Sequence, residues 1–201
     1  MVIVSITNQL KKELQESNFS PLFLENCLNS KFLSIEQNDK KIIGACFVGG
    51  TFNSNGIEII KEFQGMGLGK KLLDEIISEC QKRKISFLMG VFKPTNKISI
   101  KTHTKIGYRL LFTIFYNHQE GKEIVVILPF NLQGKFLAKF LKFFDTRIGN
   151  LIFAILFSLS QPFIKGLIAF DSQSMSKFDF GYAISHYEKV SQTLSNRDKF
   201  N

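Results

Sequence analysis

A short run of glycines and lysines points most directly to chemistry. Residues 64–71 read Gln-Gly-Met-Gly-Leu-Gly-Lys-Lys. Glycines let a ligand approach the backbone N–H groups, and the first turn of a helix favours negative charge, so a run of this kind can hold a phosphate or a diphosphate. Lys70 and Lys71 add two positive charges. The run therefore indicates a site for a phosphorylated ligand.

Two common phosphate-binding signatures do not fit this run. The P-loop requires G-x-x-x-x-G-K-[ST], but alignment on Gly69 places Gln64 at the first glycine and Lys71 at the hydroxyl position. The dinucleotide fingerprint requires G-x-G-x-x-G, whereas Gly65, Gly67 and Gly69 are spaced G-x-G-x-G. The sequence therefore predicts neither a P-loop site nor a Rossmann site.

The elements around the run must place it between a strand and a helix. A polar loop over residues 51–56 and a strand over residues 57–63 are predicted to precede it. Apolar residues recur at helical spacing over residues 72–83 and predict an amphipathic helix. A buried strand is predicted over residues 85–92, and a short helix over residues 97–106.

The flanking segments complete an α/β pattern. Helices are predicted over residues 7–17 and after Pro21, followed by a hairpin of FLSIEQ and KIIGACFVGG that turns at residues 38–39. A second hairpin is predicted from residues 108–116 and 123–130. The composition changes after Phe130, since half of the 22 phenylalanines follow it. We therefore predict one domain over residues 1–130 and a Phe-rich helical extension over residues 131–201.

Composition and charge limit the function classes. Hydrophobic residues make up 44% of the 201 residues, which allows a packed core. The net charge of +9 favours anionic partners, but the excess is spread along the chain, so no nucleic-acid partner is predicted. Cys27, Cys46 and Cys80 have no metal spacing and are expected to be free buried thiols. The start lacks a secretory signal pattern, and we expect a cytoplasmic protein.

The glycine run and its flanks resemble the GCN5-related N-acetyltransferases, the GNAT family. Gln64, Gly67 and Gly69 match the family signature [QR]-x-x-G-x-[GA]. Residues 57–63 resemble the family's fourth strand and residues 87–92 its fifth. Asn96 resembles the cofactor-contacting asparagine, and Ile106-Gly107-Tyr108 the end of the next helix. The clear resemblance covers residues 41–108.

This resemblance implies a fold, a cofactor and a reaction. The fold is a mixed, mostly antiparallel sheet flanked by helices, with the fourth and fifth strands splayed apart. The reaction is transfer of an acetyl or other acyl group from acyl-CoA to a small-molecule or peptide amine, by direct attack in a ternary complex and without a metal. The implied contacts to acyl-CoA come from Gln64, Gly65, Gly67, Gly69, Lys70 and Asn96 and from the backbone of Ile59, Ile60 and Lys61.

The resemblance also suggests groups for the proton transfers. Glu58 is the candidate base, because its strand neighbours point to the opposite face; the other interpretation is a solvent-facing carboxylate. Glu62 is a weaker candidate, and water could replace both. An N–H near Ile59 or Ile60 is the candidate donor to the developing oxyanion.

The candidate general acid departs from the family pattern. Many members carry a tyrosine seven residues after the asparagine, where this chain has His103. A histidine can donate a proton near neutral pH, but it could equally be a surface residue of a polar helix. Tyr108 is interpreted as core packing. His118, in a hairpin turn, and His186, in the tail, are interpreted as solvated.

The extension carries an unusual amphipathic segment. Residues 135–148 place six apolar side chains on one helical face and lysines on the other, which is typical of membrane-surface helices. Residues 150–170 are apolar but are interrupted by Gln161, Pro162 and Lys165, so no membrane span is predicted. Residues 135–170 are expected to contact the inner membrane face, a second subunit or the catalytic domain. The apolar residues on the helical face of residues 135–148 are Phe136, Leu137, Phe140, Leu141, Phe144 and Ile148.

The alternative function for the whole chain is an inactive CoA-binding or membrane-associated module.

Overall fold

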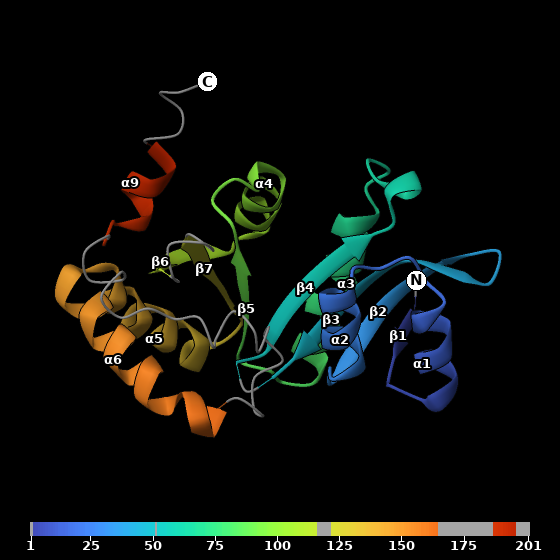
Figure 1. The fold of residues 1–201 in the computed structure, drawn as a ribbon, viewed down its shortest axis with the longest axis horizontal. Helices are drawn as coiled ribbons and strands as arrows, with labels where there is room; N and C mark the ends of the chain where they lie inside the picture. Colours follow the sequence, from blue (N-terminus) through green and yellow to red (C-terminus); the bar gives the residue numbers. More distant parts are fainter. Residues whose placement is uncertain (1, 51, 116–121, 165–186, 196–201) are drawn as a thin grey trace. The chain divides into compact units, whose positions relative to one another are not determined.

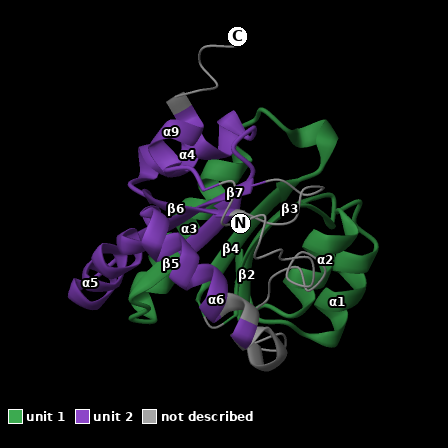
Figure 2. Ribbon diagram, turned by 60° about the vertical axis from the view of Figure 1, so that its left-hand side comes forward, with its two compact units in different colours: residues 1–88, 167–171 green, residues 89–166, 172–201 purple. Residues whose placement is uncertain are grey.

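The computed structural model describes residues 2–50, 52–115, 122–164 and 187–195. Two compact units divide the chain, and Figure 2 colours them separately. The first unit comprises residues 1–88 and 167–171, and the second comprises residues 89–166 and 172–201.

The first unit contains an antiparallel sheet, labelled in Figure 1. Its strands pair in the order β1 (Val2–Val4), β2 (Phe32–Asn38), β3 (Lys41–Gly49) and β4 (Ser54–Ile59). Asp39 and Lys40 turn the β2–β3 hairpin with φ of 49° and 66°, one residue after the turn predicted at residues 38–39. Strand β1 was not predicted, although its run of Val and Ile favours a strand.

Strand β4 begins and ends three to four residues earlier than predicted. It replaces part of the predicted loop, and a short 3-10 helix (Lys61–Phe63) replaces the end of the predicted strand. Gly56 pairs with Phe47 of β3, and a Cβ on Gly56 would lie only 2.6 Å from the Phe47 ring. The aromatic ring therefore packs over the glycine, and a segment that looks like a polar loop joins the sheet.

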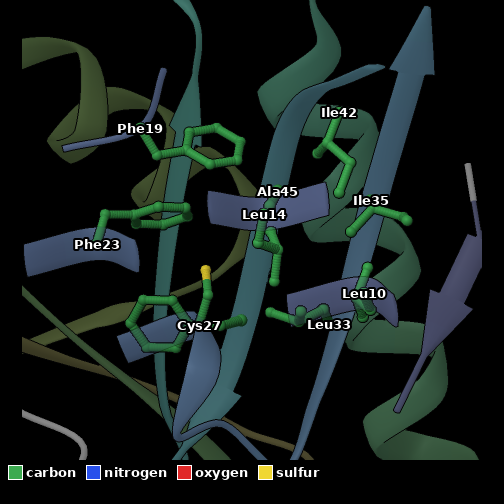
Figure 3. Packing of buried hydrophobic residues seen from close by; sticks show 10 residues of the cluster. Leu10, Leu14, Phe19, Phe23, Cys27, Leu33, Ile35, Ile42 and Ala45 are labelled. Carbon is green, nitrogen blue, oxygen red and sulfur yellow. The ribbon is translucent and has the colours of Figure 1, made fainter. Parts of the chain in front are cut away.

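Helices cover both faces of this sheet. Helices α1 (Asn8–Gln15) and α2 (Pro21–Leu28) pack on one face, and their side chains form a core with β2 and β3 (Figure 3). Thr7 Oγ1 caps α1 by accepting the Leu10 N–H at 3.1 Å. Helix α3 (Leu68–Lys82) packs on the other face, where Leu72 approaches Gly44 of β3.

Three cysteines contribute to the core as free thiols, as predicted. Cys27, Cys46 and Cys80 are buried and form no disulfide. Burial raises the pKa of the Cys80 thiol to about 12 and also raises the pKa values of Cys27 and Cys46. They are therefore protonated packing residues and not nucleophiles.

The second unit contains the remaining strands. Strand β5 (Phe87–Phe92) spans the sequence boundary between the units, and β6 (Arg109–Phe115) forms an antiparallel hairpin with β7 (Lys122–Pro129). Helix α4 (Lys97–Ile106) has the predicted bounds. The chain is therefore mixed α/β, with mostly antiparallel strands flanked by helices, as predicted. The expected splay of β4 from β5 concerns strands of different units and stays a prediction.

The helix predicted over residues 135–148 is interrupted in the structure, and a second helix follows the interruption. Helix α5 (Leu132–Leu141) is followed by a 3-10 turn (Lys142–Asp145) and by helix α6 (Arg147–Ile164). The break is fixed by side chains: Thr146 Oγ1 accepts the Gly149 N–H at 3.0 Å, and Asp145 accepts the Val190 N–H of α9 (Val190–Ser195) at 2.9 Å. None of the described helices is long and apolar enough to cross a bilayer. The boundary at residue 130 stays a prediction.

Candidate functional site

The turn between β4 and α3 leaves the first amides of the helix open. Gly67 is the N-cap of α3, has φ of 77°, and provides no side chain to cap the helix. The first N–H of α3 with a partner is that of Lys71, which donates to the Gly67 carbonyl at 3.3 Å. Within the described part of the chain, the N–H groups of Leu68, Gly69 and Lys70 have no acceptor. Three amides at a helix start can bind an anionic group.

The glycines of the turn have different roles. Gly65 and Gly67 have φ of 83° and 77°, a region that glycine adopts without strain. A Cβ at either position would meet no atom within 4 Å, so it would project into open space. Gly69 is helical, and its Cβ would only touch Ile57 at 3.8 Å. The backbone conformation therefore favours glycine at 65 and 67, whereas at 69 only the approach of a ligand favours it.

Gln64 fastens this turn to the end of β4. Its Nε2 donates to the Ile59 carbonyl at 2.9 Å. The predicted ligand residue Gln64 therefore acts on the shape of the turn. Lys70 is solvent-exposed and forms an ion pair with Asp74, one helical turn later, at 2.6 Å. An exposed pair of this kind is weak, so Lys70 can exchange its partner for an anionic ligand.

The backbone of Ile59 is directed away from β3. Ile60 N–H donates to the Ile43 carbonyl of β3 at 2.9 Å. Neighbouring residues of an antiparallel strand direct their N–H and C=O groups to opposite sides, so those of Ile59 point away from β3. Of the two predicted oxyanion donors, Ile60 is therefore engaged in the sheet, and Ile59 is the one turned outward. Lys61, the third predicted backbone contact, begins the 3-10 helix.

Glu58 lies on the face of the sheet that α1 and α2 cover. It pairs with Ala45, whose side chain belongs to the core beneath these helices. The Glu58 carboxylate accepts the Ser20 N–H at 2.7 Å and the Ser20 hydroxyl at 2.5 Å. Ser20 is the N-cap of α2, and its hydroxyl caps no amide of that helix. Glu58 is thus half-buried and held in place, and it is not a freely solvated carboxylate.

His103 is buried, so its interpretation as a surface residue is wrong. Its Nδ1 lies 2.8 Å from the Ser99 carbonyl, which assigns the proton to Nδ1 and leaves Nε2 as an acceptor when the ring is neutral. The ring packs against Phe92 and Tyr108 at centroid distances of 5.2 and 4.8 Å. Burial lowers the pKa of His103, against the opposing effect of the Ser99 hydrogen bond. Near neutral pH the ring is therefore neutral, a state in which its Nε2 accepts and does not donate.

Asn96 caps helix α4, as predicted. Its Oδ1 accepts the Ser99 N–H at 3.0 Å. Its Nδ2 has no partner among the described residues and can donate to a ligand, and this contact stays a prediction. Tyr108 is buried, which confirms its interpretation as packing. His118 and His186 lie outside the described residues.

Two serines belong to these arrangements and were missed. Ser20 holds Glu58, and Ser99 links Asn96 to His103 through its N–H and C=O. Ser20 precedes Pro21, which marks a helix start, but no sequence signal pairs it with a residue 38 positions later. The Ser99 contact follows from helical spacing, since i and i+4 residues are neighbours on a helix.

The burial of His103 predicts a pH dependence of stability. Because its pKa is lowered in the folded protein, the unfolded chain binds a proton first as the pH falls below 6.5. We therefore expect the free energy of unfolding to decrease from pH 6.5 down to the folded pKa, and the effect to be absent above that window. Urea unfolding at several pH values should show a shallower decrease for His103→Phe, which keeps the ring packing. If the free energy of unfolding decreases equally with pH in the two proteins, His103 does not contribute to the pH dependence of stability.

Comparison with known proteins adds independent information. A family model described as the acetyltransferase (GNAT) family matches residues 5–108. The search of curated proteins found no match. Several solved structures are similar in fold, and we name three.

The ribosomal-protein-S18-alanine N-acetyltransferase from Escherichia coli has 18% identity, and the match covers 65% of this chain and 94% of that one with a TM-score of 0.53. The IAA acetyltransferase from Bacillus cereus has 16% identity, with coverage of 64% and 99% and a TM-score of 0.52. A GNAT family acetyltransferase from Elizabethkingia anophelis, with acetyl-CoA bound, has 16% identity, coverage of 64% and 97%, and a TM-score of 0.52. At these identities the similarity concerns the fold.

Proposed function

The chain belongs to the GNAT family of acetyltransferases, because the family model spans residues 5–108 of its 201 residues, and we propose that it transfers an acyl group from acyl-CoA to a primary amine. The observation that carries the proposal is the set of open amides from Leu68 to Lys70 behind the left-handed Gly67. A diphosphate is the part of acyl-CoA that such amides fit. The acetyl-CoA bound to the Elizabethkingia anophelis relative supports this choice of co-substrate.

The contacts to acyl-CoA are proposed residue by residue, each for its own reason. In the first unit, the amides of residues 68–70 accept the diphosphate, Gln64 keeps the turn in shape, and Lys70 adds charge. In the second unit, the family resemblance assigns the contact to Asn96, whose Nδ2 remains a donor while Oδ1 caps α4. When bound, acyl-CoA supplies a thioester whose carbonyl carbon can react with an amine.

The chain's own groups would then manage charge and protons. We assign to Ile59 N–H the donation of a hydrogen bond to the thioester oxygen as negative charge develops there. The amine nitrogen forms a bond to the acyl carbon, the C–S bond breaks, and CoA leaves as a thiolate with the electron pair. The attacking nitrogen gives up a proton to Glu58, directly or through water. A neutral His103 is not required for these steps, because a thiolate is a tolerable leaving group without an acid.

A second candidate is a CoA-binding module without catalysis. Two observations favour it: both Glu58 oxygens accept hydrogen bonds from Ser20, and His103 is buried with Nδ1 engaged. Either arrangement could serve the fold alone. This candidate shares the acyl-CoA site with the enzyme and differs only in turnover.

One experiment separates the two candidates. The full chain is incubated with acetyl-CoA and a panel of peptide, polyamine and amino-sugar acceptors, and both free CoA thiol and acetylated amine are measured. A reaction without an amine controls for hydrolysis. We expect acetylated product from at least one acceptor class. Acetyl-CoA binding without product from any acceptor would support the module, and the absence of acetyl-CoA binding would contradict both.

The proposed compartment is the cytoplasm. Cys27, Cys46 and Cys80 are unpaired, buried thiols, which suits a reducing environment.

A further inference from the structure

Helix α5 turns its small residues inward and its large apolar residues outward. Gly134 and Ala138 form its buried face, which packs on β7 and β6. At about 100° per residue, the stripe of residues 132, 136 and 140 lies on the opposite side of the helix. The exposed fractions there are 74% for Phe136 and 56% for Phe140. A helix that only had to pack on its own domain would show the reverse pattern.

Helix α6 repeats this inverted pattern. Among the residues of α6 whose burial the structure describes, the buried ones are Gly149, Asn150 and Ala154, which are small or polar. Its exposed apolar residues recur at intervals of three or four and lie on the other face. We call the exposed apolar side chains of the two helices, taken together, the α5–α6 apolar surface. Its members are Leu132, Phe136, Phe140, Ile148, Ile152, Ile155, Leu156 and Leu159.

Polar contacts hold the helices in this orientation. The Asn150 amide on α6 donates to the Thr113 carbonyl of β6 at 3.0 Å, and both residues are buried. The Lys142 ammonium, after α5, donates to the Leu111 carbonyl at 3.1 Å and to Asp145 at 2.9 Å. Rotating either helix to bury its apolar stripe would leave buried polar groups without hydrogen-bond partners, which is unfavourable. The outward orientation of the apolar surface is therefore built into the second unit.

The charge around this surface is positive. Residues 131–164 contain four basic residues and a single acidic one, Asp145, which is buried and already engaged by Lys142. Lys135 and Lys139 are exposed and flank the Phe136–Phe140 stripe of α5, and Arg147 is exposed at the start of α6. Within residues 131–164, exposed aromatic and aliphatic side chains are bordered by basic residues and by no exposed acidic one. Such a pattern is complementary to a partner that is apolar inside and anionic at its rim.

We propose that the α5–α6 apolar surface binds an anionic lipid bilayer, with both helices lying in the membrane interface. The phenylalanines and isoleucines enter the boundary of the acyl chains, and Lys135 and Lys139 reach the headgroups with their ammonium groups. Neither helix has to cross the bilayer for this contact. The proposal is independent of acyl transfer, since it uses none of the residues assigned to acyl-CoA.

The test is binding of the full chain to lipid vesicles, measured by flotation. Vesicles of phosphatidylcholine mixed with phosphatidylglycerol are compared with vesicles of phosphatidylcholine alone. We expect stronger binding to the anionic vesicles. The double variant Phe136→Ser/Phe140→Ser should bind both kinds at least about tenfold more weakly. The variant Lys135→Gln/Lys139→Gln should bind anionic vesicles roughly twenty-five-fold more weakly and phosphatidylcholine vesicles unchanged, since each lysine near the surface contributes about fivefold.

A matched control removes the same number of exposed apolar side chains elsewhere. Val2 and Ile98 are 59% and 81% exposed on β1 and α4, so Val2→Ser/Ile98→Ser should bind vesicles like the wild type. An equal loss of vesicle binding in the control and in the Phe136/Phe140 variant would overturn the proposal. A wild-type protein that binds neither type of vesicle would overturn it as well. Sedimentation without lipid tests a second copy as the occupant. A wild-type dimer that becomes monomeric in the Phe136/Phe140 variant and does not bind vesicles would likewise overturn it.

Discussion

Replacing Gly67 by glutamate should lower the affinity for acetyl-CoA by at least about a hundredfold. Gly67 is the N-cap residue next to the amides of residues 68–70, and an added Cβ meets no protein atom there, so we expect the introduced carboxylate to lie close to the bound diphosphate. Two unit negative charges about 4 Å apart near a protein surface repel by roughly 4 kcal/mol, and part of this is screened by solvent. Isothermal titration calorimetry with acetyl-CoA measures the change directly.

The control for this variant is Gly67→Asn. Both substitutions place a side chain on a residue with φ of 77°, but asparagine tolerates this conformation and adds no charge. We therefore expect Gly67→Asn to keep a larger part of the affinity, with thermal unfolding of both variants reporting any backbone strain. Wild-type affinity in Gly67→Glu, with the protein folded, would place the diphosphate away from this turn.

Replacing Glu58 by glutamine should lower kcat by roughly a hundredfold to ten-thousandfold, the range for loss of a general base. The amide keeps the shape of the carboxylate and can still accept the Ser20 N–H, but it cannot take up a proton. The KM for acetyl-CoA should change little, because the proposed diphosphate contacts come from the turn and not from Glu58. Steady-state rates with the best acceptor of the screen, measured across pH, test this expectation.

Ser20→Ala provides the comparison that a structural role requires. It removes the hydroxyl that donates to Glu58 and leaves the carboxylate able to accept a proton. If Glu58 is the base, Glu58→Gln loses the rate and its acidic pH limb, whereas Ser20→Ala keeps that limb. If Glu58 only fastens α2, both variants lose stability and keep the kcat of the folded protein. The second outcome would transfer the role of base to Glu62 or to water.

Most of the fold could be predicted because local signals and the tertiary structure agree. The N-cap at Thr7, Pro21 at a helix start and Gly107 at a helix end mark boundaries that the structure confirms. The start of β4 could not be predicted, because Gly56 belongs to the sheet only through the Phe47 ring on a neighbouring strand. The break after α5 likewise depends on Asp145 contacting α9, which is distant in sequence.

The candidate site likewise contains features that could be predicted from the sequence and features that could not. The glycines could be predicted because backbone conformation and ligand approach place strict demands on a few consecutive residues. The environment of His103 could not, since its burial depends on Phe92 and Tyr108 from the adjoining strand and loop. The amphipathic character of residues 135–148 was visible, but which face turns inward was not. The structure buries the small residues Gly134 and Ala138 of α5, which packs against β6 and β7.

The most direct test of the account is amide NMR of the isotope-labelled chain during titration with acetyl-CoA. If the turn binds the diphosphate, the N–H signals of Gly67, Leu68 and Gly69 will shift more than those of Gly44 and Gly56 inside the sheet. These signals will shift over the same range of acetyl-CoA concentration in which calorimetry measures the heat of binding. Saturable acetyl-CoA binding that leaves the three turn signals in place would contradict the central claim.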